Sequence, residues 1–167
     1  MPHSLTQLLD AKGVLLADGA TGTNLFEVGL EAGEAPEMWL ESHPDRITAL
    51  HQAFVDNGAD IILSCSFGAN RHRLKLHQAE GRTHALNRIA AELARAVADA
   101  AGRPVVVGGS VGPTGELLQP LGALSYAEAV EAFREQIAGL KDGGVDVVWI
   151  ETMSAAEEVR AAAEAAL

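Results

Sequence analysis

Acidic and hydroxyl side chains stand at or just after apolar runs in this sequence, where they could meet around a small ligand. The residues concerned are Asp18, Ser64 and Glu151. The two carboxylates suit an ammonium group, and the backbone N–H groups of Gly19 and Ala20 could receive a carboxylate. An α-amino acid carries both groups, so the sequence predicts an amino-acid site. The alternative is that Asp18 and Glu151 only cap the next element or remain solvated.

Further polar groups accompany these residues. Asn70 follows the second apolar run and is a further candidate substrate-binding residue. Ser66 in that run, and Gly109 and Ser110 at the end of the third, lie at the same strand tips. Ser64 and Ser66 share one face of an extended chain, because side chains alternate along a strand. Cys65 then faces the other way, which favours a buried core thiol over a nucleophile. No basic partner that would lower the pKa of this thiol is evident in the sequence.

Four short apolar runs, rich in Val, Ile and Leu, must position these side chains. Such runs are typical of buried parallel strands, and the segments between them predict amphipathic helices. Ser125 with Glu128, and Ser154 with Glu157, have the spacing of helix-capping boxes. The predicted strands are 14–18, 60–66, 104–109 and 145–150, and the predicted helices are 5–9, 44–57, 86–102, 125–143 and one that begins at 154.

This alternation predicts an α/β protein built from four parallel (β/α) units. An open doubly wound sheet and part of a (β/α)8 barrel both fit, and either fold binds ligands at the carboxyl ends of its strands. A complete barrel typically has about 250 residues, whereas this chain has 167. We expect residues 1–167 to be a single domain with open sheet edges, which are prone to pairing.

Composition excludes several classes of function. Apolar residues make up 48% and charged residues 21%, which excludes a disordered chain. The net charge of -11 makes a nucleic acid an unfavourable partner, and no apolar run predicts a membrane span. The single cysteine excludes an internal disulfide and a multi-cysteine metal site, and it fits a reducing cytoplasm.

Other motif interpretations are weaker. The loop after Asp18 lacks the glycine spacing of a dinucleotide site, and the sequence has no P-loop. His72, His77 and His84 lack the spacing of zinc ligands. The irregular stretch 29–39 is longer than most connections, and loops of this length are often functional.

Four motifs together resemble the homocysteine S-methyltransferase family, which includes betaine–homocysteine methyltransferases and the homocysteine-binding module of cobalamin-dependent methionine synthase. They span nearly the whole chain: Leu16-Ala17-Asp18-Gly19-Ala20-Thr21-Gly22-Thr23, Gly58–Ile62 leading to Ser66-Phe67-Gly68-Ala69-Asn70, Gly109-Ser110-Val111-Gly112-Pro113-Thr114-Gly115-Glu116, and Val145–Thr152. The resemblance implies the first four units of a (β/α)8 TIM-type barrel and transfer of a methyl group to the thiol of homocysteine, which gives methionine.

The resemblance also implies roles for individual residues. Asp18 and Glu151 match carboxylates that hold the substrate ammonium, Gly19 and Ala20 match the turn that binds its carboxylate, and Ser64 matches a nearby hydroxyl position. The family binds zinc through three cysteines in the second half of its barrel, and Cys65 matches none of them. We therefore expect this chain to be the amino-acid-binding half, incomplete and inactive alone, which associates with itself or with the second half.

Two alternatives stay open at the level of sequence. One is a non-catalytic half-barrel that binds an amino acid and assembles through its sheet edges. The other is a different barrel enzyme that acts on an amino acid. The methyl donor is also open, since betaine, S-methylmethionine, S-adenosylmethionine and cobalamin or folate carriers all occur in such families.

Overall fold

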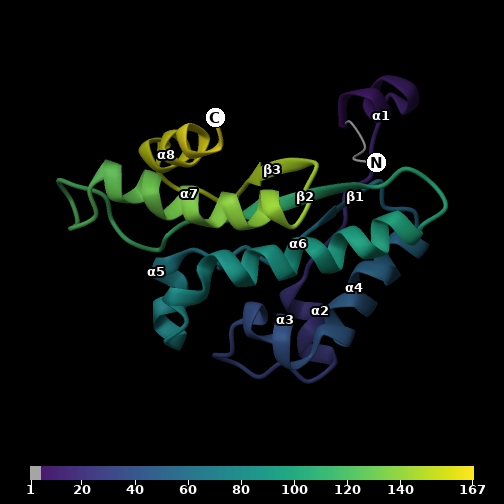
Figure 1. The fold of residues 1–167 in the computed structure, drawn as a ribbon, viewed down its shortest axis with the longest axis horizontal. Coiled ribbons are helices and arrows are strands. Elements are labelled where there is room, and N and C mark those ends of the chain that lie inside the picture. The colour runs from purple at the N-terminus through teal and green to yellow at the C-terminus, as the bar shows by residue number, and fades with distance from the viewer. Residues whose placement is uncertain (1–4) are drawn as a thin grey trace.

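A computed structural model describes residues 5–167, and its centre is a sheet of three parallel strands (Figure 1). The strands lie side by side in chain order, and each crossover between them contains helices. This confirms an α/β protein with parallel strands. The strands are β1 (Ile61–Leu63), β2 (Val106–Val111) and β3 (Val147–Ile150).

Register brings the carboxyl ends of the strands together. Ile61 pairs with Val106, and Gly108 pairs with Val147, in parallel ladders. All residues of the central strand β2 are buried, as expected for a strand with neighbours on both edges and helices on its faces.

The predicted first strand, 14–18, is wrong as a strand. The structure has only an isolated parallel bridge between Ala17 and Ile61. Val14 is 80% exposed and Leu16 is 58% exposed. The segment forms its bridge to β1 on one side only. No described residue covers the side chains of Val14 and Leu16. An apolar run alone therefore did not suffice to form a buried strand here.

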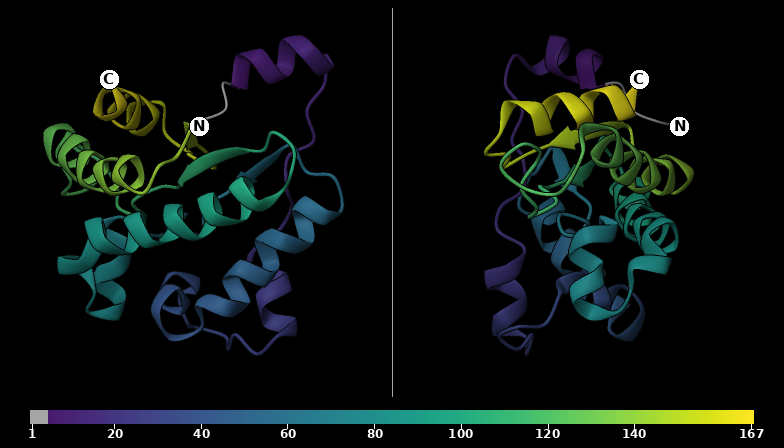
Figure 2. Two further views of the ribbon diagram at one scale, coloured as in Figure 1. Left: turned by 45° about the vertical axis from the view of Figure 1, so that its right-hand side comes forward. Right: turned by 90° about the vertical axis from the view of Figure 1, so that its left-hand side faces the viewer.

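Helices flank the sheet, and α6, α7 and α8 follow one another across one side of it (Figures 1 and 2). No helix among residues 5–167 has the length and apolar character needed to cross a bilayer. The α-helices are α1 (Leu5–Lys12), α2 (Gly22–Glu27), α3 (Trp39–Ser42), α4 (Pro44–Asp56), α5 (Arg71–Leu74), α6 (Thr83–Ala100), α7 (Tyr126–Asp142) and α8 (Ala156–Ala166). Short 3₁₀ turns are η1 (Pro36–Met38), η2 (Lys75–His77) and η3 (Glu80–Arg82).

One predicted capping box is confirmed and the other is wrong. The Ser125 side chain accepts from the N–H of Glu128 at the start of α7, and the Glu128 carboxylate accepts in return from the N–H of Ser125. The second helix, α8, begins later than predicted. Its N-cap is Ala155, which has no capping side chain, so the Ser154 spacing alone did not set the helix start.

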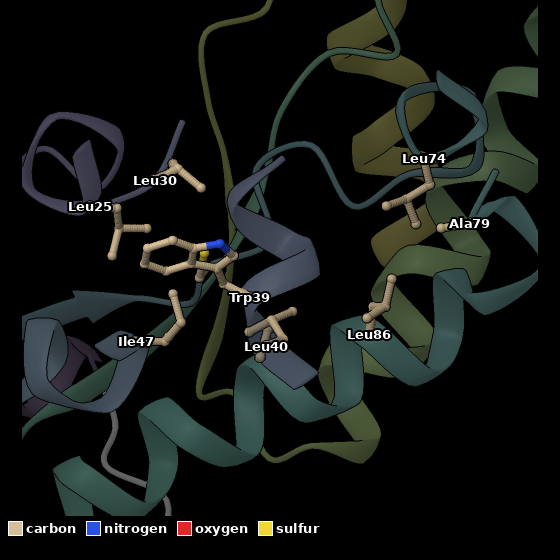
Figure 3. Packing of buried hydrophobic residues seen from close by; sticks show 10 residues of the cluster. Leu25, Leu30, Trp39, Leu40, Ile47, Leu74, Ala79 and Leu86 are labelled. Carbon is tan, nitrogen blue, oxygen red and sulfur yellow. The ribbon is translucent and has the colours of Figure 1, made fainter. Parts of the chain in front are cut away.

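A buried cluster between the helices and the sheet anchors the loop that precedes α4. Trp39 lies among Leu25, Leu30 and Ile47 (Figure 3). Cys65 belongs to the same cluster and is 4% exposed. Burial, together with the negative charge of Glu37, raises the pKa of the Cys65 thiol well above its ordinary value. The prediction of a core thiol is confirmed.

His51 is a buried polar residue of α4. It is 1% exposed, and neither ring nitrogen has a hydrogen-bond partner among the described residues. Burial lowers the pKa of His51 to about 4, because a charged ring loses its hydration without gaining a partner. The ring is therefore neutral in the folded protein at pH 7.

Acid should destabilise the fold through His51. Between pH 6.5 and about 4 the unfolded chain binds a proton at His51 that the folded chain does not bind, so stability falls with pH in this window. His51→Phe removes this effect. We expect the wild type to lose about 2 kcal/mol relative to His51→Phe between pH 7 and pH 5, measured by urea denaturation.

Equal denaturant m-values for the two proteins would show that both unfold from comparable states. A difference in the free energy of unfolding that is the same at both pH values would contradict this account of His51.

Candidate functional site

A cavity of about 550 Å³ opens at the carboxyl ends of the strands. Its volume lies within the range of about 300–1,000 Å³ that is typical of small-molecule sites. We call one part of its lining the sheet-side wall, made of Leu63, Ser64, Ser66, Ser110 and Glu151. The facing loops contribute the loop-side wall, made of residues 33–37, Arg73, Leu76 and His77.

Asp18 is fixed beside this cavity by β1. Its N–H donates to the carbonyl of Ile61 at 2.9 Å, and its Oδ2 accepts from the N–H of Leu63 at 2.8 Å. Burial raises the pKa of Asp18 to about 6, the Leu63 N–H opposes this rise, and the negative charge of Glu151 adds to it. Asp18 and Glu151 therefore lie close enough to repel each other, as the predicted ammonium site requires.

Glu151 follows β3 directly and lines the cavity. Its N–H donates to the carbonyl of Val111 at 3.0 Å, and its Oε1 accepts from the Ser110 hydroxyl at 2.7 Å. The next residue, Thr152, has a φ of 59°. This conformation is unfavourable for a β-branched residue and costs about 1–3 kcal/mol. A strained turn thus sets the position from which the Glu151 side chain leaves the strand.

Three serines form a hydrogen-bonded chain across the strand ends. The Ser66 hydroxyl donates to the carbonyl of Ser110 at 2.8 Å, and the Ser64 and Ser66 hydroxyls are 2.7 Å apart. Because Ser66 has one hydroxyl proton and uses it on Ser110, Ser64 must donate to Ser66. Ser64 also accepts from the Ser110 N–H at 3.2 Å. What remains on the Ser64 oxygen is a lone pair, which can accept from a ligand cation.

Gly19 and Ala20 also line the cavity. No acceptor among residues 5–167 takes a hydrogen bond from the N–H of either residue. Two successive free N–H groups are suited to an anion, which agrees with the turn predicted to bind a carboxylate.

The prediction that Asn70 contacts the substrate is not supported by its position in the structure. It is fully buried, and it is not part of the cavity lining. Its Oδ1 accepts from the N–H groups of His72 and Arg73 at 3.1 Å each, and its Nδ2 donates to the carbonyl of Pro113 at 3.1 Å. Both the oxygen and the nitrogen of the amide are hydrogen-bonded within the protein, so Asn70 caps α5 and does not face the cavity.

Three residues that line the cavity were not predicted for it: Ser110, which was expected only at a strand end, Glu37 and Arg73. Glu37 is 5% exposed and accepts from the N–H of Gly68 at 2.6 Å. A side chain on Gly68 would meet this carboxylate, since a Cβ there would lie 2.9 Å from Oε1. The length of the loop 29–39 was the only signal for Glu37.

The described residues do not fit a zinc site. Among residues 5–167 no group of three His, Cys, Asp or Glu side chains could hold a metal ion. The thiol of Cys65 is buried, and its pKa is raised, whereas a zinc ligand must be a thiolate. These residues would therefore not hold the zinc ion that the resemblance implies for the family.

The fold is that of an α/β protein with parallel strands and a cavity at the carboxyl ends of those strands. The family model for homocysteine S-methyltransferase matches residues 15–167. The chain belongs to the homocysteine S-methyltransferase family.

Two curated relatives are methionine synthases, from Mycobacterium tuberculosis (strain ATCC 25618 / H37Rv) and Mycobacterium leprae (strain TN). They are 33% and 32% identical to this chain over 168 residues. Each match covers 94% of this chain but only 14% of the relative. The chain thus spans about one seventh of the length of these relatives.

Solved structures of the homocysteine methyltransferase MmuM from Escherichia coli are also similar. The metallated form has a TM-score of 0.84 and 28% identity, over 96% of this chain and 61% of that chain. The apo form has a TM-score of 0.70 and 25% identity, over 95% of this chain and 56% of that chain.

The electrostatic coupling between Asp18 and Glu151 can be measured directly. Carboxyl ¹³C NMR should show that Asp18 titrates with a pKa of about 6. Glu151→Gln should lower the pKa of Asp18, because it removes a nearby negative charge. The pKa should still lie above the ordinary value, because burial is the larger cause.

Glu157→Gln removes the same charge from the exposed start of α8 and provides the control. We expect it to leave the titration of Asp18 unchanged. If the pKa of Asp18 is the same in Glu151→Gln as in the wild type, the two carboxylates are not neighbours.

Proposed function

We propose that this chain binds homocysteine as the acceptor in a methyl transfer that yields methionine. The observation that carries the proposal is a pair of carboxylates beside the free N–H groups of Gly19 and Ala20: Glu151 lines the cavity, and Asp18, next to the lining residue Gly19, is repelled by Glu151. Membership of the homocysteine S-methyltransferase family supports the same substrate.

The ammonium of homocysteine has three N–H donors, and the site offers a matching number of acceptors. These are the carboxylates of Asp18 and Glu151 and the free lone pair of Ser64. The substrate carboxylate lies against Gly19 and Ala20. Hydrogen bonds between charged groups are stronger than neutral ones, so this arrangement fixes the amino-acid end and leaves the thiol side chain to extend into the cavity.

Binding of a cation also resolves the repulsion within the site. In the free protein Asp18 is protonated below pH 6, since its pKa is about 6. The ammonium favours the ionised form and lowers this pKa. Affinity for the amino acid should therefore fall as the pH drops below about 6, where binding requires loss of a proton from Asp18.

In the reaction the homocysteine sulfur forms a bond to the methyl carbon of the donor. The bond between that carbon and the donor heteroatom breaks, its electron pair stays with the leaving group, and the thiol proton is released. The residues described here bind and orient the acceptor for this displacement.

The architecture belongs to the same proposal. We assign residues 1–167 to the first four units of a (β/α)8 barrel, in a cytoplasmic protein. The parallel bridge at Ala17 and the likeness to MmuM support this assignment. The exposed Val14 and Leu16 favour association of this edge with further polypeptide or with a second copy.

Loss of the carboxylates tests the proposal. Asp18→Ala and Glu151→Ala should each weaken homocysteine binding by about tenfold to a hundredfold, the effect of one charged hydrogen bond. Isothermal titration calorimetry at pH 7.5 measures this change, and for the wild type the affinity should fall below pH 6. Methionine formation, measured by mass spectrometry, tests the transfer itself.

Asp10→Ala removes an exposed carboxylate of α1 and should leave binding unchanged. Homocysteine binding that survives both site substitutions would overturn the assignment. Binding that is retained without methionine formation, with any donor supplied, would favour the non-catalytic assembly module instead.

A further inference from the structure

One polar side chain reaches the strand ends from outside the cavity. Gln136 lies in the middle of α7 and is fully buried. Among the buried residues of α7, all of which the structure describes, it alone has a polar side chain. Its Nε2 donates to the carbonyl of Ser66 at 2.8 Å, 70 positions earlier in the chain. Gln136 is not part of the cavity lining, so it can influence a ligand there only through other residues.

The stability of the fold does not explain this bond. The carbonyl of Ser66 also accepts from the N–H of Ala69 at 3.0 Å, so it would keep a partner without Gln136. The Oε1 of Gln136 has no hydrogen-bond partner among residues 5–167. A buried polar atom without a partner destabilises a protein, and an apolar side chain of similar size would avoid this cost. The benefit of Gln136 must therefore lie in the position that it gives to Ser66.

Ser66 begins a turn, residues 66–69, that side-chain amides hold at both ends. Gln136 bonds to the first residue of the turn. At the other end, the Nδ2 of Asn87 on α6 donates to the carbonyl of Ala69 at 2.8 Å. Because Asn87 fixes the far end independently, loss of the Gln136 bond would release mainly the end that carries Ser66.

The position of Ser66 decides which part of the Ser64 hydroxyl is available to a ligand. The Ser66 hydroxyl donates to the carbonyl of Ser110 at 2.8 Å and therefore accepts from Ser64, at 2.7 Å. This uses the Ser64 proton and leaves a lone pair on an oxygen at the cavity. If the Ser66 hydroxyl moved out of reach, the Ser64 proton could rotate into the cavity, where it would repel an ammonium group.

We propose that Gln136 is a positioning residue of the homocysteine site. Its bond to the Ser66 carbonyl holds the Ser66 hydroxyl in place, and this hydroxyl keeps Ser64 an acceptor for the substrate ammonium. The inference rests on the proposed function, since it concerns how the ammonium of homocysteine is bound. Gln136 itself touches no ligand.

Gln136→Met tests the proposal, because methionine has a similar shape and no N–H donor. We expect the urea midpoint of this variant to equal or exceed that of the wild type, since an unpaired polar atom is removed. Homocysteine affinity, measured by calorimetry, should fall about fivefold to tenfold, the effect of one hydrogen bond. A lower urea midpoint together with an unchanged affinity would show a purely structural role and overturn the proposal.

A second ligand shows whether the ammonium is the group affected. 4-Mercaptobutyrate lacks only the amino group of homocysteine, and both ligands are titrated into the same protein, so the folded fraction cancels from the ratio of their affinities. Gln136→Met should reduce the preference for homocysteine over 4-mercaptobutyrate. An equal loss of affinity for both ligands would contradict the assignment.

A double-mutant cycle tests the route through Ser66. Ser66→Ala should weaken homocysteine binding, and the further change Gln136→Met should then have little effect, because no hydroxyl remains to be positioned. If Gln136→Met costs the same affinity with and without Ser66→Ala, the two residues act independently and the proposal is wrong.

Ile137→Ala provides the control. It removes a buried apolar side chain from the same helix, so it should lower the urea midpoint while leaving homocysteine affinity unchanged.

The two proposals fail separately. If the chain binds no homocysteine, the proposed function fails, and NMR of the free chain still tests the role of Gln136. The buried hydroxyl protons of Ser64 and Ser66 should exchange with water faster in Gln136→Met than in the wild type or in Ile137→Ala. Unchanged exchange in Gln136→Met would show that Gln136 does not position Ser66.

Discussion

Ser110 ties together the strand ends that form the site. Its N–H donates to Ser64, its carbonyl accepts from Ser66, and its hydroxyl donates to Glu151. One residue of the central strand therefore bonds to the end of β1 and to the residue that follows β3. Because the bonds to Ser64 and Ser66 are buried, breaking one would leave a polar group without a partner, which costs about 1–3 kcal/mol. The geometry of the cavity wall formed by the strand ends depends on these bonds of Ser110.

Asp60 and Asp18 lie at opposite ends of β1 and have pKa values shifted in opposite directions. At the amino end of β1, burial would raise the pKa of Asp60, but bonds from Lys12 and Leu16 and the charge of Arg103 outweigh burial and lower it. At the carboxyl end, Asp18 has the N–H of Leu63 and no cation among the described residues, so its pKa is raised. The protein thus supplies cations that balance the charge of Asp60, and among the described residues it supplies none for Asp18, which is why the proposed function places a ligand ammonium there.

Sequence patterns correctly predicted features that depend mainly on residues close to one another in the chain. The end of β3 at Ile150, the capping box at Ser125 and the core position of Cys65 follow from local periodicity or spacing. The ends of the other two strands were wrong, because β1 ends at residue 63 rather than 66 and β2 at residue 111 rather than 109. The strand at 14–18 was wrong, because an apolar run becomes a buried strand only when both its faces are covered. Glu37 and Arg73 could not be predicted as partners, since long-range folding brings η1 and α5 to one cavity.

Three features of the site raise the free energy of the folded protein when no ligand is bound. Asp18 is partly buried without a cation, it is repelled by Glu151, and Thr152 has an unfavourable positive φ. Each feature destabilises the free protein, and an ammonium ion removes the first two. In the proposed complex, part of the free energy of binding would therefore come from relief of repulsion that is present in the free protein. A site that was fully satisfied in the free protein would be more stable and would bind a zwitterion more weakly.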